Sequence, residues 1–133
     1  ASRYLFYFGL ENVREDWYIT EKFWLGFRVG AVPVYYGAPQ AALLAPGGNR
    51  SFIDVTQFPN AQKLAERLAF LRDHPDEYAK YFAWKQQPIP PLTREAMRLA
   101  GLDPDDHTGG STWACRICEA VAVIKEARLR KKS

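Results

Sequence analysis

The stretch YLFYFGL at residues 4–10 is a short, nearly continuous run of apolar residues, and a second run, VPVYY, occupies Val32–Tyr36. Runs of this length are typical of strands that are buried on both faces, as they are in parallel sheets. The segment between them, residues 20–30, has the spacing of a helix. Strand, helix and strand in this order predict a βαβ unit, the building block of a parallel sheet.

Local sequence signals mark both ends of this helix. Thr20 is the expected N-cap residue, and Gly30 stands where a helix commonly ends. Phe23, Trp24 and Phe27 recur at helical spacing and share one face. We expect this face to be buried.

The rest of the chain predicts one more strand and then helices only. The remaining elements that we expect are a strand at residues 51–55, helices beginning near Asn60, Pro75 and Thr93, an acidic loop at residues 103–106 and a helix through residues 113–124. Leu64, Leu68 and Leu71 are spaced as a helical stripe, which favours core packing. We therefore predict an α/β fold, a Rossmann-like parallel sheet with flanking helices, that forms the last part of a doubly wound domain.

Length and composition fit one soluble globular domain, which we place at residues 1–133. The chain is 47% hydrophobic and 25% charged, and no stretch approaches the ~18 apolar residues of a membrane span. The net charge of +3 does not support nucleic-acid binding, and we interpret the basic run at residues 128–132 as a solvated helix end. The chain starts without a Met or a signal peptide, so we expect a processed chain or a fragment.

The two cysteines, Cys115 and Cys118, form a Cys-x-x-Cys pair, and their spacing leaves free thiols and a short local disulfide equally open. A structural zinc site needs four ligands, and the two histidines are not spaced to complete one, so we expect no metal site. Asn49-Arg50-Ser51 is a glycosylation sequon. Asn49 is therefore a candidate glycosylation site, which mildly favours the secretory pathway.

Polar residues gather at the carboxyl edge of the expected sheet, the edge at which open α/β folds bind ligands. Glu11 and Asn12 directly follow the first strand and add polar groups for a sugar or a base. Lys22 lies in the first turn of the expected helix, where the helix dipole disfavours a cation. A bound anion would relieve that conflict, because the ammonium and the backbone N–H groups would both face it. The residues alone thus predict a nucleotide or sugar-phosphate site.

Several short motifs follow one another along the chain. They are Phe8-x-x-Glu11-Asn12, Tyr18-Ile19-Thr20-Glu21-Lys22, Gly30-Ala31-Val32-Pro33-Val34, Ser51-Phe52-Ile53, Pro75-x-x-Tyr78, Trp84-Lys85 and Cys115-x-x-Cys118. In this order and spacing they resemble the α1,3/4-fucosyltransferases, glycosyltransferase family 10. Gly37-Ala38-Pro39 is similar to the plant-type enzymes that fucosylate the core of N-glycans. Leu10, Val13 and Trp17 depart from the family's usual Phe, Ser and Asp.

The resemblance implies the C-terminal, donor-binding domain of a two-domain GT-B glycosyltransferase. By that resemblance, Lys22 neutralises the diphosphate of GDP-fucose, and Asn12, Tyr18 and Glu21 contact the nucleotide and the fucose. Glu11 and Thr20 belong to the same motifs and complete the expected donor site. The resemblance also implies a disulfide between the two cysteines.

The implied function is transfer of fucose from GDP-fucose, with inversion and in α1,3 linkage, to N-acetylglucosamine of glycoprotein N-glycans. The catalytic base and a second basic residue for the diphosphate are expected upstream, so no catalytic residue is assigned here and we expect the fragment alone to be inactive. The acceptor glycan would bind through an N-terminal domain, and no cofactor or divalent metal is implied. The family is expected in the Golgi lumen, held by an upstream membrane anchor.

Two other functions fit the same residues. One is a non-catalytic module that binds a nucleotide sugar, and the other is a GT-B glycosyltransferase with a different donor.

Overall fold

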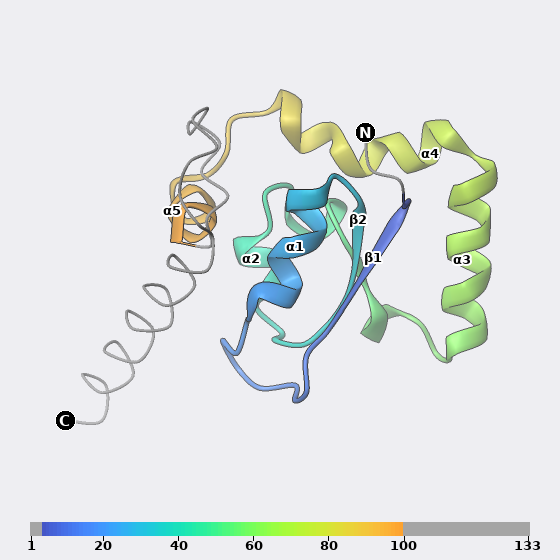
Figure 1. Ribbon diagram of the computed structural model, residues 1–133, viewed down its shortest axis with the longest axis horizontal. Coiled ribbons are helices and arrows are strands. Elements are labelled where there is room, and N and C mark those ends of the chain that lie inside the picture. The colour runs from blue at the N-terminus through green and yellow to red at the C-terminus, as the bar shows by residue number, and fades with distance from the viewer. Residues whose placement is uncertain (1–3, 100–133) are drawn as a thin grey trace.

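The computed structural model describes residues 4–99 (Figure 1). The strands are β1 (Phe6–Leu10), β2 (Val32–Tyr36) and β3 (Ile53–Asp54); the α-helices are α1 (Glu21–Val29), α2 (Ala41–Leu44), α3 (Ala61–Asp73), α4 (Pro75–Ala79) and α5 (Pro91–Leu99); the 3₁₀ helices are η1 (Gly48–Arg50), η2 (Val55–Gln57) and η3 (Lys80–Gln86). The expected acidic loop, the last helix, the basic run and the pair Cys115 and Cys118 lie outside the described residues. None of the helices in residues 4–99 has the length and apolar character that a membrane crossing requires.

The three strands form one parallel sheet in the order β1-β2-β3, which confirms the predicted βαβ unit. Phe8 is paired with Val34, and Val34 is paired with Ile53. The central strand β2 is buried along nearly its whole length, as its continuous apolar run predicts. The third strand is shorter than expected, because the Asp54 carboxylate accepts a hydrogen bond of 2.9 Å from Thr56 N and starts the turn of η2.

Within residues 4–99, the first strand is less buried than its apolar run predicts. Phe8 is 54% exposed and Leu10 is 48% exposed, whereas Gly9 between them is buried. In the part of the chain that the structure describes, β1 is an edge strand with a partner on one side only. An apolar run therefore identified the strand correctly, but the position of the strand in the sheet decides how much of it is covered.

Helices cover both faces of the sheet, as expected for a doubly wound fold (Figure 1). Successive residues of a strand point to opposite faces, and β2 shows this alternation. Tyr35 packs with the buried side chains of α1, whereas Val32 and Val34 pack with Leu71 of α3. The predicted leucine stripe of α3 is confirmed, since Leu64 and Leu68 lie partly buried against the same group.

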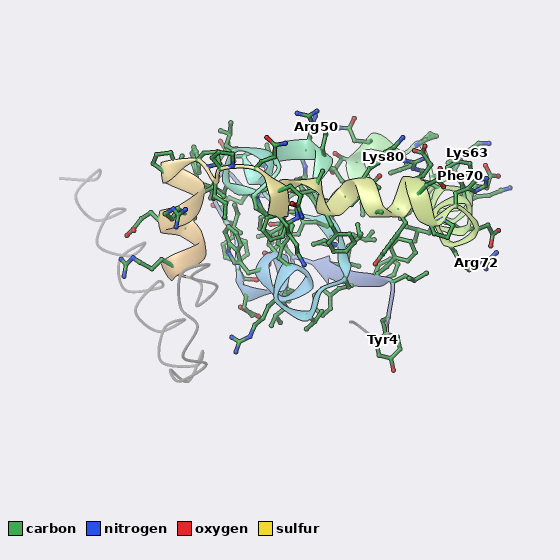
Figure 2. The ribbon with its side chains drawn as sticks, turned by 90° about the horizontal axis from the view of Figure 1, so that it is seen from above. Tyr4, Arg50, Lys63, Phe70, Arg72 and Lys80 are labelled. Carbon is green, nitrogen blue, oxygen red and sulfur yellow. The ribbon has the colours of Figure 1, made fainter. Side chains whose placement is uncertain are left out.

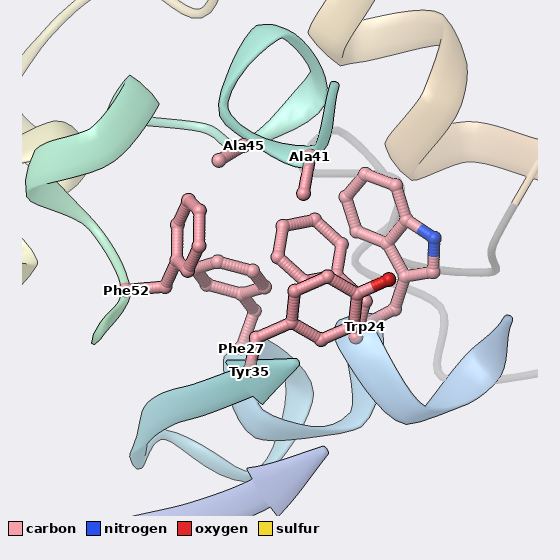
Figure 3. Close-up of a cluster of buried hydrophobic side chains, with 7 residues drawn as sticks. Trp24, Phe27, Tyr35, Ala41, Ala45 and Phe52 are labelled. Carbon is pink, nitrogen blue, oxygen red and sulfur yellow. The ribbon is translucent and has the colours of Figure 1, made fainter. Parts of the chain in front are cut away.

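The face toward α1 holds a cluster of aromatic rings (Figure 3). Phe23 is fully buried at its centre, with its ring centroid 4.6 Å from that of Tyr35 and 4.9 Å from that of Trp24. Phe27 and Phe52 lie at 5.3 Å on other sides of the same ring. Burial of each ring contributes about 1.5–3 kcal/mol, so this cluster fixes the angle of α1 on the sheet. The predicted apolar face of the helix is thereby confirmed.

Two glycines let α1 approach the strands closely. A β-carbon on Gly26 would lie 2.7 Å from Cγ of Pro33, and one on Gly9 would collide with the backbone carbonyl of Lys22. Gly9 thus brings the first turn of α1 directly onto β1. The helix start and the carboxyl end of the strand are close because this position has no side chain.

We expect Gly9→Ala to lower the free energy of unfolding by about 3 kcal/mol, because the added methyl group meets rigid backbone. Val29→Ala, at a half-exposed position of α1, is the control and should change stability by about 0.5 kcal/mol or less. Urea-induced unfolding measures both. Equal stability of Gly9→Ala and the wild type would contradict the close contact of β1 and α1.

Candidate functional site

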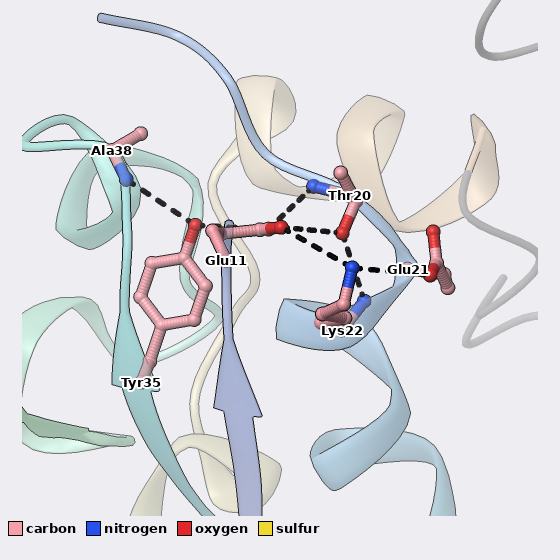
Figure 4. A network of polar contacts seen from close by, with 6 residues as sticks. All are labelled: Glu11, Thr20, Glu21, Lys22, Tyr35 and Ala38. Atoms are coloured by element: carbon pink, nitrogen blue, oxygen red, sulfur yellow. Dashed lines mark hydrogen bonds and ion pairs between the residues drawn. The ribbon is translucent and has the colours of Figure 1, made fainter. Parts of the chain in front are cut away.

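The candidate site lies at the carboxyl ends of β1 and β2, where the chain enters the loops at residues 11–20 and 37–40 (Figure 4). Glu11 is the first residue after β1, and its backbone N–H donates to Tyr36 O at 2.8 Å, which extends the ladder by one residue. Parallel strands end together, so Glu11 and the end of β2 are neighbours at one edge. The residues that sequence motifs marked are therefore brought to the edge where ligands bind in this class of fold.

The Glu11 carboxylate is buried and bonded on all sides. It accepts hydrogen bonds of 2.7 Å from both the backbone N–H and the hydroxyl of Thr20, and one of 3.2 Å from the Tyr35 hydroxyl. Its side chain has no exposed surface. The prediction that Glu11 contacts a sugar or base stays untested, but these bonds show what the residue does in the fold: it joins the end of one strand to the start of α1.

Thr20 is the N-cap residue of α1, as predicted. Its backbone is extended, and its hydroxyl accepts a hydrogen bond of 3.3 Å from Lys22 N while donating to Glu11. Phe23 N donates to the Thr20 carbonyl at 3.2 Å. The backbone N–H groups of Thr20, Lys22 and Phe23 are therefore already used inside the protein. The expectation that backbone N–H groups at the helix start would face a bound anion is wrong for these three groups.

Lys22 lies between two carboxylates. Its Nζ is 3.9 Å from Oε2 of Glu11 and 3.9 Å from Oε1 of Glu21, and its side chain is 35% exposed. Both carboxylates stand at the start of a helix, where negative charge is favourable. They offset the unfavourable position of the lysine cation, so the first turn needs no bound anion to be electrostatically balanced. The lysine side chain is nevertheless partly exposed to solvent, so its ammonium is able to change partners.

Tyr35 completes the site, and the motifs did not identify it. Its hydroxyl donates to Glu11 and accepts a hydrogen bond of 3.3 Å from Ala38 N, so it ties the loop after β2 to the loop after β1. Burial, and secondly the negative charge of Glu11, raise the pKa of Tyr35 well above its ordinary value, which keeps the hydroxyl protonated. Gly37 permits this arrangement, since a β-carbon there would collide with the Tyr35 hydroxyl and lie 2.6 Å from Cγ of Glu11.

A second tie joins the same two loops at the surface. The Gln40 side chain accepts a hydrogen bond of 3.0 Å from Trp17 N and donates one of 3.1 Å to Oδ1 of Asp16. Asn12 is exposed nearby in sequence, and Tyr18 is half-buried. Both could reach a ligand, and neither is shown to do so. No sequence motif identified Gln40, because its hydrogen-bond partner Trp17 lies 23 residues away in the chain.

Other candidate positions lie apart from this group in sequence. Asn49, the candidate glycosylation site, is exposed in η1. Ser51, the third residue of the sequon, is buried, and its hydroxyl donates a hydrogen bond of 2.9 Å to Gly48 O. Among the residues described here, no group of three or more His, Cys, Asp or Glu side chains could hold a metal ion.

We expect Tyr35→Phe to lower the free energy of unfolding by about 1–3 kcal/mol, because it removes a donor to a buried carboxylate and leaves Ala38 N without its acceptor. Tyr36→Phe is a matched control at a less buried neighbour on the same strand. Urea-induced unfolding at neutral pH measures the difference. Identical stability of the two variants would show that the hydroxyl of Tyr35 is not the joint between the loops.

The raised pKa of Tyr35 predicts a dependence on pH. Below its ordinary value of 10.0 the hydroxyl is protonated in the folded and unfolded states, and its contribution to stability is fully present. Above that pH the unfolded chain loses the proton first, so stability falls as the pH rises toward the folded pKa. The stability difference between wild type and Tyr35→Phe should therefore shrink between about pH 9 and about pH 11. A constant or growing difference would contradict the buried, neutral hydroxyl.

Comparison with known proteins places this geometry in a family. Residues 1–132 match the family described as glycosyltransferase family 10 (fucosyltransferase) C-term. The chain is 45% identical over 128 residues to GDP-fucose protein O-fucosyltransferase 3 of Canis lupus familiaris, covering 90% of this chain and 26% of that protein. The human protein of that name is 31% identical over 127 residues, with the same two coverages.

A relative with another name also matches. Alpha-(1,3)-fucosyltransferase 4 of Mus musculus is 44% identical over 89 residues, which is 65% of this chain and 20% of that protein. The chain thus spans about a quarter of the length of the first relatives, at 26%. A parallel sheet with helices on both faces is consistent with the α/β donor-binding part of a GT-B enzyme. The chain belongs to glycosyltransferase family 10, the fucosyltransferases, and matches the C-terminal part of that family.

Proposed function

We propose that this chain binds GDP-fucose at the carboxyl edge of its sheet, as the donor-binding part of a fucosyltransferase. The observation that carries the proposal is the position of Lys22. Its partly exposed side chain stands at the start of α1 beside the strand ends, in a family whose relatives include proteins named for GDP-fucose. A cation at this edge suits the diphosphate of such a donor.

The interaction energies favour movement of the Lys22 ammonium from its carboxylate neighbours to the diphosphate when the ligand binds. The contact with Glu21 is long, at 3.9 Å, and both side chains are partly exposed, so this pair contributes about 0–1 kcal/mol. The contact with the buried Glu11 carboxylate is equally long, at 3.9 Å. A charge-assisted hydrogen bond to phosphate contributes about 1.5–3 kcal/mol. Glu11 keeps its bonds from Thr20 and Tyr35 when the lysine moves away. The ammonium can therefore turn to a ligand while the loops stay in place.

Side-chain charge must provide most of the attraction at this helix start. The N–H groups of Thr20, Lys22 and Phe23 are occupied, and the neighbouring Glu11 and Glu21 are acidic. One lysine does not balance a diphosphate in such surroundings. A second cation is therefore part of the proposal, as the resemblance to the family implies.

The proposed reaction is a direct displacement at the anomeric carbon of fucose. The acceptor oxygen forms the new C–O bond as the bond to the GDP oxygen breaks, the configuration inverts, and a base takes the acceptor proton. Lys22 stabilises the negative charge that grows on the departing diphosphate. The Glu11 carboxylate is buried among its partners and is therefore not assigned as the base. We place the base in the part of the enzyme that binds the acceptor.

We propose a hydroxyl group of a protein as the first candidate acceptor. It is supported by relatives named GDP-fucose protein O-fucosyltransferase 3, which match over 90% of this chain. The second candidate is N-acetylglucosamine of N-glycans, fucosylated in α1,3 linkage. It is supported by the relative named alpha-(1,3)-fucosyltransferase 4 and by the motifs similar to plant-type enzymes. A place in the Golgi lumen and an upstream anchor belong to the same proposal, supported by the resemblance alone.

Lys22→Ala should weaken GDP binding by about ten- to a hundredfold, which corresponds to the loss of one charge-assisted bond at 1.4 kcal/mol per decade. Lys63→Ala is the matched control, because Lys63 is also paired with a carboxylate but lies on α3 (Figure 2). Calorimetric titration with GDP at two salt concentrations, with a melting curve for each variant, measures the effect. Unchanged GDP affinity in Lys22→Ala would make this residue a solvated surface lysine, and the proposed donor site would fall.

Transfer assays with the full-length enzyme and GDP-fucose distinguish the acceptors. We expect mass spectrometry to find added fucose on a serine or threonine of a protein acceptor, and not on its N-glycan. Fucose on the N-acetylglucosamine would select the second candidate. GDP binding with no transfer to either acceptor would favour a non-catalytic nucleotide-sugar-binding module.

A further inference from the structure

Trp17 has an uncommon backbone conformation. Within residues 4–99 it is the one residue other than glycine with a positive φ, at 61°. Large side chains rarely occupy this left-handed region, because the β-carbon crowds the backbone, and glycine or asparagine usually takes such positions. A backbone outlier of this kind is often found at a binding site, where surrounding contacts hold it in place.

Contacts from another loop hold Trp17 in this conformation. Tyr18 N donates to Glu15 O at 3.2 Å and closes a tight turn in which Trp17 is the third residue. The Gln40 side chain then binds both sides of the turn, accepting from Trp17 N at 3.0 Å and donating to Asp16 at 3.1 Å. The strained turn is thus supported from the loop that follows β2.

Packing among residues 4–99 does not explain why a tryptophan occupies this turn. Its side chain is 50% exposed, and none of the ring contacts within the described part of the chain involves it. Trp24, by contrast, is buried in the aromatic cluster. The turn therefore presents an indole to solvent at the ligand-binding edge of the sheet, five positions before Lys22. An exposed ring on a backbone turn that hydrogen bonds hold in place is suited to stacking on a flat ligand.

We propose that Trp17 contacts the donor by stacking its indole on the guanine base, an inference that rests on the proposed function. The two exposed residues before it, Glu15 and Asp16, supply carboxylate oxygens, which can only accept hydrogen bonds. The N1–H and N2–H₂ groups of guanine form a donor edge that such oxygens complement. The same carboxylates repel a diphosphate, so the base is the part of GDP that this turn suits.

Because the Trp17 backbone is strained, its substitution by glycine should affect the melting temperature and the GDP affinity differently. In Trp17→Gly the full-length protein should melt at the same or a higher temperature, because glycine accepts a positive φ. Its affinity for GDP should fall by about tenfold, since base–aromatic stacking is worth this much or more. Trp17→Phe keeps a ring and should retain most of the affinity. Val13→Gly is the control for added backbone freedom in the same loop and should leave GDP affinity unchanged.

The choice of ligand separates a contact with the base from a general effect on the loop. Inorganic pyrophosphate should bind Trp17→Gly as tightly as wild type, and GDP-fucose should lose affinity by the same factor as GDP. Equal loss for pyrophosphate, or a larger loss for GDP-fucose than for GDP, would overturn the stacking on guanine. If Lys22→Ala loses GDP binding while Trp17→Gly does not, this inference fails and the proposed donor site stands. If the wild type binds no GDP, both fail.

Discussion

The structure of this site depends on one buried carboxylate. Glu11 is anionic in an interior position where an unpaired charge would be strongly unfavourable, so its oxygens must find donors. Two come from Thr20 and one from Tyr35. Because these donors belong to the N-cap of α1 and to β2, satisfying the charge fixes the helix start and both strand ends relative to one another. Removing the Tyr35 hydroxyl would leave Ala38 N without its acceptor, and removing the Thr20 hydroxyl would leave Lys22 N without one.

The close packing around this carboxylate follows from the lack of side chains at two positions. Gly9 brings the first turn of α1 onto β1, and Gly37 leaves room for the Tyr35 hydroxyl beside Glu11. The aromatic cluster then holds α1 on the sheet along its buried face, with Phe23 at the centre. Backbone approach, hydrogen bonding and apolar burial therefore act on the same helix. A rigid helix start is what a ligand-binding lysine in the first turn requires.

In the free protein, the positive charge of Lys22 at this edge is balanced by neighbouring carboxylates. Lys22 has two carboxylate neighbours, and the backbone N–H groups of Thr20, Lys22 and Phe23 already have acceptors. A diphosphate that binds here must displace the lysine from these neighbours and share its charge. This requirement is a physical reason for a donor site that is completed by a further cation. The hydrophobic and hydrogen-bonded parts of the site need no such change.

Residue spacing was enough to predict the βαβ unit, the apolar face of α1, the Thr20 cap and the family motif around Lys22, because each depends on residues close together in the chain. The spacing did not predict that β1 has a partner on one side only within residues 4–99, that Glu11 is buried, or that Tyr35 and Gln40 hold the loops together. The hydrogen bonds of Gln40 and Tyr35 join residues that are 23 and 24 positions apart in the sequence, and only folding brings these residues into contact. The partners of Lys22 show the same limit: Glu21 is its neighbour in sequence, but Glu11 becomes one only because parallel strands place their carboxyl ends beside the helix start.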